Sequence, residues 1–475
     1  MPQDLAAWLN YIENLHPKSI AMGLARTEQV LAELAFKPPF KIITVGGTNG
    51  KGSTCAMLEQ MYVQAGFRVG CYTSPHLIRY NERVRVNLVE VSDDVLCAAF
   101  AAIESARVKA NVALTYFEVG TLAAVWHFMH ANIDVAILEV GLGGRLDTVN
   151  AFDADCAIVT SIDLDHQEFL GDTREKIGFE KAAIYRPNTP AICGDANPPA
   201  SLVNYAQSIG AQWLSIHDAF DFSQPDASLK DNSWVFHTHT ALESVMRERL
   251  QNIQPMQTAV ANKVESNVAH NTATFNKNIE LPLPMLAGQY QLNNASCAIA
   301  AVQALQDDLP VTTAHIAKAM QQVALTGRFQ TVLSHPQVIL DVAHNPHAAR
   351  ALNANLQTLI AQTNCKVIAV FAMLADKDIQ GVVNAIAPLI DVWFVAPIDH
   401  IRGAQLSDMQ SILLHVAAEK NINTFNSVNA AYNAAIANAE TRIKQGENVK
   451  IIVFGSFFTV AAVMQAIAPE NAVLH

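Results

Sequence analysis

Charged residues, paired cysteines and unbroken apolar runs are all scarce in this 475-residue sequence. Only 16% of the residues are charged, and the formal net charge of -12 argues against a nucleic-acid-binding surface, because phosphate binding needs clustered positive potential. The seven cysteines are scattered without a C-x-x-C pair, so we interpret them as buried thiols. The most apolar region, 119–142, is interrupted by His127, His130, Asn132 and Asp134, which argues against a membrane-spanning helix.

The N-terminus lacks both the basic leader and the cleavable apolar core of a signal peptide. We therefore expect a cytoplasmic protein that begins with a helix. Apolar residues make up 51% of the chain, which is enough to build large buried cores. A chain of 475 residues is too long for one ordinary domain, so two domains are expected.

Apolar, β-rich runs alternate with helical patterns, and this alternation predicts a parallel sheet with helices on both faces. The same rhythm restarts after Arg328, which predicts a second α/β domain. Between them, 218–280 is rich in Asn, Gln, His, Ser and Thr and only weakly periodic, so we expect a loop-rich insertion in the first domain. The predicted strands cover 41–47, 68–72, 134–141 and 155–162, then 337–344, 366–374, 391–397 and 449–456.

The strongest chemical signal is VGGTNGKGST, residues 45–54, between a predicted strand and a predicted helix. Small residues let backbone N–H groups turn toward a polyphosphate, the helix N-terminus adds positive potential, and Lys51 reaches the outer phosphates. A plain glycine-rich turn is the alternative. We favour nucleotide binding, and hence a P-loop-type first domain, because Lys51 directly follows Gly50 in this context.

The motif departs from an ordinary Walker A sequence, since Val45 replaces the first glycine and Gly52 replaces the usual Ser/Thr. A magnesium-binding hydroxyl is therefore expected from elsewhere. Ser74, Glu139 and His166 lie in separate islands, and they converge on the phosphates if their islands meet at the carboxyl ends of the strands. Taken singly, a histidine or glutamate after a strand is more often a loop or capping residue.

Arginines gather in RYNERVRV as Arg79, Arg83 and Arg85. They form either an anion-binding cluster or the solvated face of a β-hairpin, and the alternating charges favour the hairpin.

Taken in order, these islands resemble the folylpolyglutamate synthase/dihydrofolate synthase family of the Mur ligase superfamily. The resemblance rests on GTNGKGS, YTSPHLIRYNERVRV, LTYFEVGTLAA, ILEVGLGGRLDTVN, SIDLDHQEFLG, EKAAI, TGRFQ, DVAHNPHA, DKD and VFGSFFTVA. It implies a P-loop-type, mostly parallel sheet domain over 1–326 and a smaller, Rossmann-like α/β ligase domain over 327–475. The stretch 218–280 has no counterpart in these islands.

The resemblance also implies roles for individual residues. It implies that phosphate is bound by Thr48, Asn49, Gly50, Lys51, Gly52 and Ser53. It also implies that the nucleotide is contacted by Asn294, Arg328 and Asp341. Of these, Asn294 is ambiguous because Asn293 stands beside it. Two magnesium ions are expected on Ser74, Glu139 and His166, and Lys181 matches a lysine that is often carbamylated in the family. The pteridine pocket is expected from Thr115, Phe117, Asp147 and Thr148, closed in part by NLHPKSIAMGLAR, and the glutamate side from His344 and Ser456.

The implied activity is ATP-dependent addition of L-glutamate to dihydropteroate and to reduced folates, through an acyl phosphate and with release of ADP and phosphate. The implied catalytic residues are Lys51, Lys181 and His344, and the implied state is a monomer that binds neither nucleic acid nor membrane. Three alternatives stay open at this point: another Mur-type ligase of cell-wall synthesis, a P-loop kinase or motor ATPase, and a regulatory nucleotide-binding module. GTNGKGS and YFEVG favour the folate branch, and DVAHNP with the second α/β domain weighs against the kinase.

Overall fold

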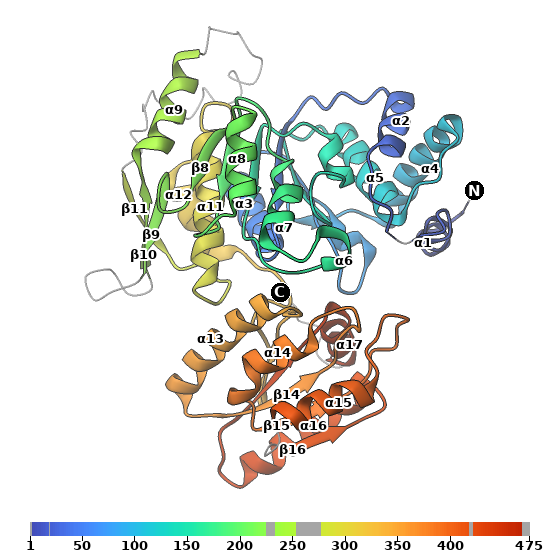
Figure 1. The fold of residues 1–475 in the computed structure, drawn as a ribbon, viewed down its shortest axis with the longest axis vertical. Helices are drawn as coiled ribbons and strands as arrows, with labels where there is room; N and C mark the ends of the chain where they lie inside the picture. The colour runs from blue at the N-terminus through green and yellow to red at the C-terminus, as the bar shows by residue number, and fades with distance from the viewer. Residues whose placement is uncertain (1, 19, 225–232, 253–276, 418–420, 468–475) are drawn as a thin grey trace.

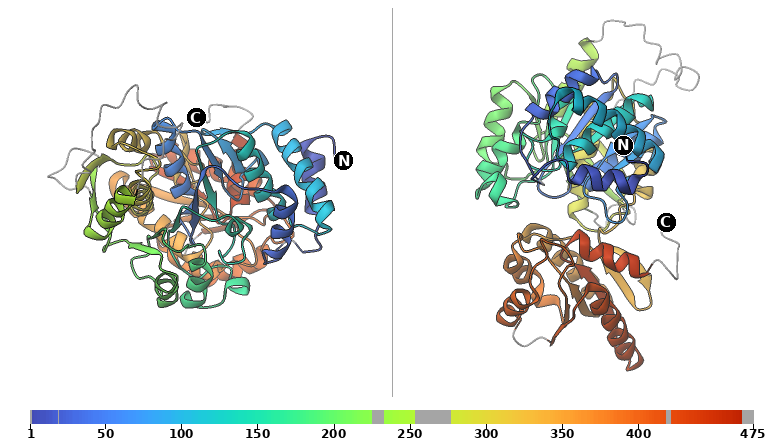
Figure 2. Two further views of the ribbon diagram at one scale, coloured as in Figure 1. Left: turned by 90° about the horizontal axis from the view of Figure 1, so that it is seen from above. Right: turned by 90° about the vertical axis from the view of Figure 1, so that its right-hand side faces the viewer.

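The chain forms two α/β bodies, one above the other in Figure 1 and again in the side view of Figure 2. The structure, a computed structural model, describes residues 2–18, 20–224, 233–252, 277–417 and 421–467. The upper body contains an eight-stranded sheet and the lower body a six-stranded sheet. Both sheets are mostly parallel, which confirms the predicted fold class.

The eight-stranded sheet has the order β4-β3-β2-β5-β1-β6-β7-β8, so β1 lies in the middle. All neighbours from β2 to β8 pair in parallel, and the β3–β4 hairpin adds two antiparallel strands at one edge. Apart from Lys41 at the start of β1, the central strands β1, β5 and β6 are buried because helices cover both faces. The strands are β1 (Lys41–Gly46), β2 (Val69–Tyr72), β3 (Val84–Val86), β4 (Val89–Glu90), β5 (Val135–Glu139), β6 (Cys156–Val159), β7 (Pro190–Cys193) and β8 (Gln212–Ser215).

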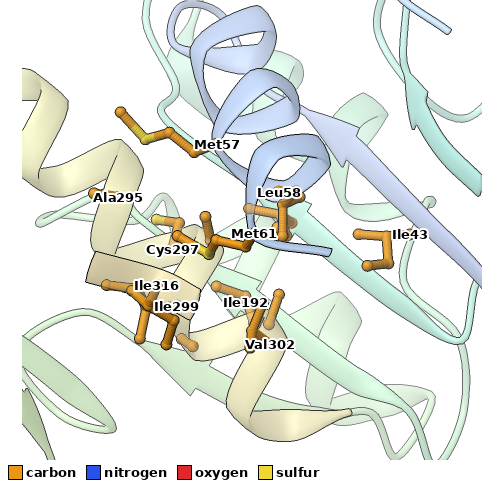
Figure 3. Packing of buried hydrophobic residues seen from close by; sticks show 14 of the residues in the cluster. Ile43, Met57, Leu58, Met61, Ile192, Ala295, Cys297, Ile299, Val302 and Ile316 are labelled. Atoms are coloured by element: carbon orange, nitrogen blue, oxygen red, sulfur yellow. The ribbon is translucent and has the colours of Figure 1, made fainter. Parts of the chain in front are cut away.

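Helices α3 (Lys51–Gln64), α11 (Tyr290–Ala304) and α12 (Thr313–Gln322) cover one face of this sheet and share one hydrophobic core. Figure 3 shows Met61 of α3 beside Cys297 of α11, with Met57 and Leu58 in the same cluster. Nearly every residue of α11 is buried, because small Ala, Ser and Cys side chains let its neighbours approach closely. The other face carries α1 (Leu5–Glu13), α2 (Ala25–Leu34), α4 (Asp93–Ala110), α5 (Tyr116–His130), α7 (Arg174–Ala182) and α8 (Ala200–Ser208).

The stretch 218–280 differs from the loop-rich insertion expected from the sequence. Its described part holds a three-stranded antiparallel sheet of β9 (Phe220–Ser223), β10 (Ser233–Thr238) and β11 (Asn278–Pro282), followed after β10 by α9 (Thr240–Asn252). Trp234 and Phe236 of β10 point into the core of the upper body, but the strands are too short for their period-two pattern to stand out. Residues 225–232 and 253–276 of this stretch lie outside the described residues.

The six-stranded sheet has the order β12-β13-β17-β14-β15-β16, with only β12 antiparallel. Its strands are β12 (Gln330–Ser334), β13 (Gln337–Leu340), β14 (Lys366–Phe371), β15 (Val392–Val395), β16 (Asn421–Thr424) and β17 (Val449–Phe454). One face is covered by α13 (Pro346–Thr363), α14 (Ile379–Ile386) and α15 (Leu406–Val416), the other by α16 (Val428–Lys444) and α17 (Phe457–Ile467).

The arginine-rich segment does form the β3–β4 hairpin, but the expectation of a solvated face is wrong for Arg85. Its side chain is 16% exposed and lies 2.7 Å from the Glu59 carboxylate on α3. Arg83 lies over the rings of Tyr80 and Tyr116, whereas Arg79 is largely exposed. A buried carboxylate on α3 therefore draws the arginine inward.

Among the described helices, none combines the length and the apolar character that a membrane span requires.

Candidate active site

The loop between β1 and α3 has the backbone shape of a phosphate cradle. Gly47 and Gly50 adopt φ angles of 142° and 89°, a region that disfavours other residues. A side chain at Gly47 would collide with Thr160 Oγ1, and one at Gly50 would collide with the carboxamide of Asn294. The Thr48 and Asn49 N–H groups donate to Ser161, so a close anionic partner would meet the N-terminus of α3 that follows them.

Two lysines converge on this loop. Lys51 Nζ lies 3.2 Å from the Gly47 carbonyl oxygen and 3.3 Å from that of Thr48. Lys181 Nζ, from α7, lies 2.9 Å from the same Gly47 oxygen. Burial, and next to it the charge of Lys51, lowers the pKa of Lys181 to about 7. The positive charge of Lys51 beside a helix N-terminus is suited to a polyphosphate, whereas Lys181, with its lowered pKa, is partly neutral near pH 7.

The other residues expected to bind phosphate form contacts with several different segments of the chain. Thr48 Oγ1 donates to the Asp163 carbonyl, Asn49 Nδ2 lies 2.8 Å from His347 Nδ1, and buried Ser53 accepts a hydrogen bond from Gln291. Gly52 faces the Glu139 carboxylate. The structure therefore holds the whole segment 47–53 at the carboxyl end of β1, where a nucleotide is expected in such a sheet.

Glu139 and Ser74 meet at the ends of β5 and β2. The Ser74 backbone N–H donates to Glu139 Oε2 at 2.9 Å, and among the described residues it supplies the one hydrogen bond to this carboxylate. Burial raises the pKa of the Glu139 carboxyl, and the charge of Lys51 opposes that rise. A buried carboxylate beside a serine fits a divalent cation, which prefers oxygen ligands and would stabilise the charge.

His166, the third expected metal ligand, precedes the short helix α6 (Gln167–Leu170) after β6. Its Nε2 lies 3.3 Å from Lys377 Nζ, and burial lowers its pKa to about 4 against the opposing charge of Asp165. Within the described ranges, no hydrogen bond joins His166 to Ser74 or Glu139, and no three His, Cys, Asp or Glu residues gather as a metal cluster. The charge of Lys51 acts to lower the pKa of both Glu139 and His166.

The nucleotide contacts expected from further along the chain approach the same loop. The Asn294 carboxamide faces Gly50, whereas neighbouring Asn293 donates to the Gly194 carbonyl at 2.9 Å. Arg328 Nη2 lies 3.8 Å from the point where a Cβ on Gly52 would stand. Burial raises the pKa of Asp341 to about 6, opposed by Arg328, while its carboxylate accepts N–H groups of Phe329 and Ala343.

The expected pteridine residues line the loop after β5 and the start of α5. Thr115 caps α5, and the Phe117 ring packs on Gly141 at 2.5 Å from its ideal Cβ position. Asp147 precedes the 3-10 turn Thr148–Ala151 and accepts the Leu142 and Val149 N–H groups at 2.8 and 2.9 Å. Burial raises the pKa of Asp147 to about 6. Thr115 and Asp147 thus have structural roles as caps besides any contact with a ligand.

The N-terminal stretch packs against this loop, as expected. The Gly23 N–H donates to the Leu146 carbonyl, and Arg26 forms an ion pair with Glu118 at 2.8 Å.

His344 and Ser456 lie at the carboxyl ends of β13 and β17. His344 Nδ1 is 2.8 Å from the Val342 carbonyl oxygen, and its Nε2 is 3.8 Å from Asp165 Oδ2. Burial lowers the pKa of His344 to about 4. Ser456 accepts the Phe458 N–H at the start of α17. His344 therefore reaches Asp165 of the upper body, whereas the hydrogen bond described for Ser456 stays within the lower body.

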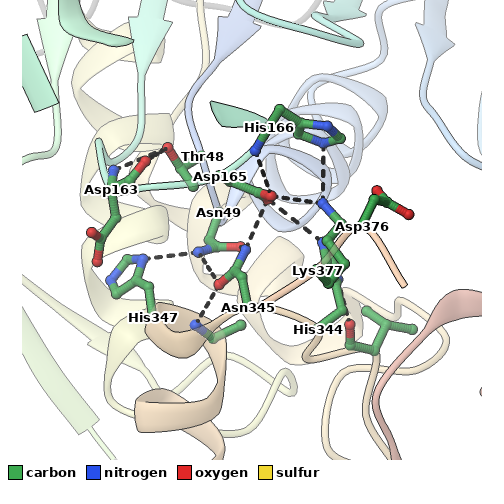
Figure 4. A network of polar contacts seen from close by, with 12 residues as sticks. Thr48, Asn49, Asp163, Asp165, His166, His344, Asn345, His347, Asp376 and Lys377 are labelled. Atoms are coloured by element: carbon green, nitrogen blue, oxygen red, sulfur yellow. Dashed lines mark hydrogen bonds and ion pairs between the residues drawn. The ribbon is translucent and has the colours of Figure 1, made fainter. Parts of the chain in front are cut away.

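Sequence reasoning gave no role to Asp165, Asn345 or Lys377, which help to join the two bodies. Asp165 pairs with Lys377 at 2.6 Å and accepts from Asn345 at 3.0 Å, and Asn345 in turn bonds Asn49 of the phosphate loop (Figure 4). Burial acts to raise the pKa of Asp165, but Lys377 together with His166 and His344 outweighs it and holds that pKa well below its usual range. The motifs SIDLDHQEFLG, DVAHNPHA and DKD contain these residues, but a motif does not reveal that they meet.

Comparison with known proteins gives consistent matches over nearly the whole chain. The family described as Mur ligase middle domain matches residues 45–302, and that described as Mur ligase, glutamate ligase domain matches residues 327–457. The dihydrofolate synthase/folylpolyglutamate synthase of Escherichia coli (strain K12) is 41% identical over 465 residues, which cover 98% of this chain and 95% of that protein.

Solved structures agree. That of E. coli FolC in complex with DHPP and ADP has a TM-score of 0.82 at 41% identity and covers 98% of this chain and 99% of its own. The Yersinia pestis bifunctional folylpolyglutamate synthase/dihydrofolate synthase complexed with AMPPNP and Mn ion has a TM-score of 0.81 at 39% identity, with 98% and 99% covered. Sequence, fold and site geometry agree: this chain belongs to the dihydrofolate synthase/folylpolyglutamate synthase family of the Mur ligases.

Proposed function

We propose that this protein is an ATP-dependent amide ligase that adds L-glutamate to dihydropteroate, forming dihydrofolate, and to reduced folates. The observation that carries the proposal is the meeting of Lys51, Lys181 and Asn294 on one phosphate loop, with Arg328 beside Gly52. Membership of a family in which the E. coli relative is named for both activities supports the choice of acceptors. The relative bound to DHPP and ADP supports a folate-type acceptor beside the nucleotide.

In the proposed reaction, a carboxylate oxygen of the acceptor attacks the γ-phosphorus of ATP in line and ADP leaves, which gives an acyl phosphate. The α-amine of glutamate then attacks the activated carbonyl carbon, loses a proton, and phosphate leaves. Lys51 and the N–H groups at the N-terminus of α3 stabilise the negative charge that spreads over the transferring phosphoryl group. Magnesium held by Ser74 and Glu139, with His166, would supply further charge neutralisation there.

The second body would complete the site by docking. Arg328 points toward the phosphate loop from the start of that body, and Asn345 bonds Asn49 across the junction. Docking of this kind excludes water, which would hydrolyse an acyl phosphate. We assign the glutamate side to His344 and Ser456, and we propose that 1–326 and 327–475 act as the two separate domains.

Lys181 is proposed to be carbamylated. In that step the neutral amine nitrogen attacks the carbon of carbon dioxide and releases one proton, so the product is an anionic carbamate. The lowered pKa of Lys181, about 7, supports this because it makes neutral amine available near neutrality. We also propose a monomer in the cytoplasm, and the seven free cysteines fit a reducing compartment.

The proposal is tested with purified protein, ATP, magnesium and glutamate, offered dihydropteroate or a reduced folate in separate reactions. We expect glutamate-dependent ADP release with both acceptors. Release with the reduced folate alone would leave a monofunctional polyglutamate synthase, and release with neither would reject the function. Acceptor-independent ATP hydrolysis, measured without glutamate, is the control.

A further inference from the structure

A buried ion pair joins the two bodies at the candidate site. Asp165 follows β6 in the upper body, and Lys377 follows β14 in the lower body. Lys377 Nζ lies 2.6 Å from Asp165 Oδ1, and the two side chains are 7% and 10% exposed. Another ion pair across this junction, Arg350 with Asp163, is 58% and 27% exposed. A buried pair that loses one partner leaves an uncompensated charge, so Lys377 has reason to stay in place.

The same ammonium also covers a nitrogen of His166. Lys377 Nζ lies 3.3 Å from His166 Nε2, so the group bridges the Asp165 carboxylate and the imidazole (Figure 4). The second Asp165 oxygen is occupied by Asn345 Nδ2 at 3.0 Å, with His344 Nε2 at 3.8 Å. An imidazole nitrogen has one lone pair, which either accepts a proton donor or coordinates a cation. A divalent ion on Nε2 would also face the positive charge of Lys377 at short range.

We propose that Lys377 competes with the divalent ion for His166 Nε2 and so links metal loading to the docking of the two bodies. The inference rests on the proposed function, in which His166 is a metal ligand. Lys377 is then a positioning residue: without the ion it holds the lower body to Asp165 and His166, and with the ion it is released from the imidazole. A lysine that merely fastens the bodies together would have no such effect on metal affinity.

The direction of the effect separates the two roles. Binding of Mn²⁺ to the nucleotide-free full chain is measured by electron paramagnetic resonance of the free ion. Competition predicts that Lys377→Met binds Mn²⁺ about tenfold more tightly, because a repelling charge and a rival for the lone pair are both removed. A fastening role predicts unchanged or weaker binding. Unchanged or weaker Mn²⁺ binding by a folded Lys377→Met variant therefore overturns the inference.

Two further variants complete the test. Arg350→Met breaks an exposed pair at the same junction without touching His166, and we expect the affinity for Mn²⁺ to be that of the wild type. A tightening in Arg350→Met equal to that in Lys377→Met would attribute the effect to loosened docking and overturn the inference. His166→Ala should weaken Mn²⁺ binding. If it does not, the metal assignment in the proposed function fails first, and the inference fails with it.

A measurement on the wild type keeps the inference testable if Lys377→Met does not fold. Lysines are acetylated briefly with acetic anhydride, with and without saturating Mn²⁺, and quantified by mass spectrometry. We expect Mn²⁺ to raise acetylation of Lys377 severalfold and to leave Lys366, which is 58% exposed at the start of β14, unchanged. Equal labelling of Lys377 in both conditions contradicts its release.

Discussion

Replacement of Lys181 by methionine should make the protein more stable while it abolishes ligation. The side chain is 4% exposed, and burial together with the charge of Lys51 lowers its pKa from 10.5 to about 7. That difference, at 1.36 kcal/mol per pKa unit, corresponds to about 5 kcal/mol of folding free energy lost to keeping the amine buried and charged. Loss of the hydrogen bond to Gly47 offsets about 1 kcal/mol, so Lys181→Met should gain roughly 3 to 4 kcal/mol near pH 7.

The predicted stability difference between Lys181→Met and the wild type depends on pH. Between the two pKa values the unfolded chain holds more protons at this lysine than the folded chain does, so wild-type stability rises with pH in that interval. The advantage of Lys181→Met should therefore be complete below about pH 7 and fade as the pH rises toward 10.5. Urea unfolding of both proteins in buffer free of carbon dioxide, at several pH values, measures it.

Added bicarbonate supplies a second readout. Carbamylation of the folded protein would stabilise the wild type by mass action and leave Lys181→Met unaffected. A variant that is less stable than the wild type at pH 7, or an advantage independent of pH, would refute the reasoning.

Three other substitutions test separate parts of the site. Lys51→Ala should lower kcat by about a hundredfold to a thousandfold while circular dichroism and melting change little, since its ammonium acts on phosphoryl charge; near wild-type turnover would remove it from catalysis. Glu139→Gln keeps the shape of a buried side chain but removes its charge, so the magnesium concentration for half-maximal rate should rise about tenfold or more, and an unchanged titration would remove Glu139 from the metal site. Because burial raises the pKa of Asp147 to about 6, the affinity of the wild type for dihydropteroate should fall as the pH drops through 6. Asp147→Asn should bind dihydropteroate about tenfold more weakly and lose this pH dependence. Equilibrium binding measures both, and equal affinity of the two proteins at pH 7 would assign Asp147 to loop structure alone.

Much of the fold follows from local pattern. The strand β1, the turn at 47–50 and the helix α3 are all evident in KIITVGGTNGKGS, because apolar β-branched residues, glycines and a helical run succeed each other there. The small sheet of β9, β10 and β11 is not evident, since its strands pair across 225–232 and 253–276 and each strand is only four to six residues long. Long-range pairing decides such strands, and a local pattern does not encode it.

The site shows the same division. The roles of Lys51 and Gly50 can be predicted from the sequence because their chemistry depends on adjacent residues in one loop. Asn294 becomes distinguishable from Asn293 only in three dimensions, where one faces Gly50 and the other Gly194. The pairing of Asp165 with Lys377 spans 212 positions and two sheets, so neither motif alone indicates it. The burial of Arg85 is likewise not evident from RYNERVRV, because its partner Glu59 lies on α3, 26 positions away.

The most direct test of the central claim follows an oxygen atom. Dihydropteroate labelled with oxygen-18 in its carboxylate is converted with ATP, magnesium and glutamate, and the phosphate released is analysed by mass spectrometry. Attack of the carboxylate on the γ-phosphorus predicts one labelled oxygen in each phosphate, with ADP formed in equal amount to the amide. Label in AMP, or amide formation with unlabelled phosphate, would contradict the acyl-phosphate mechanism.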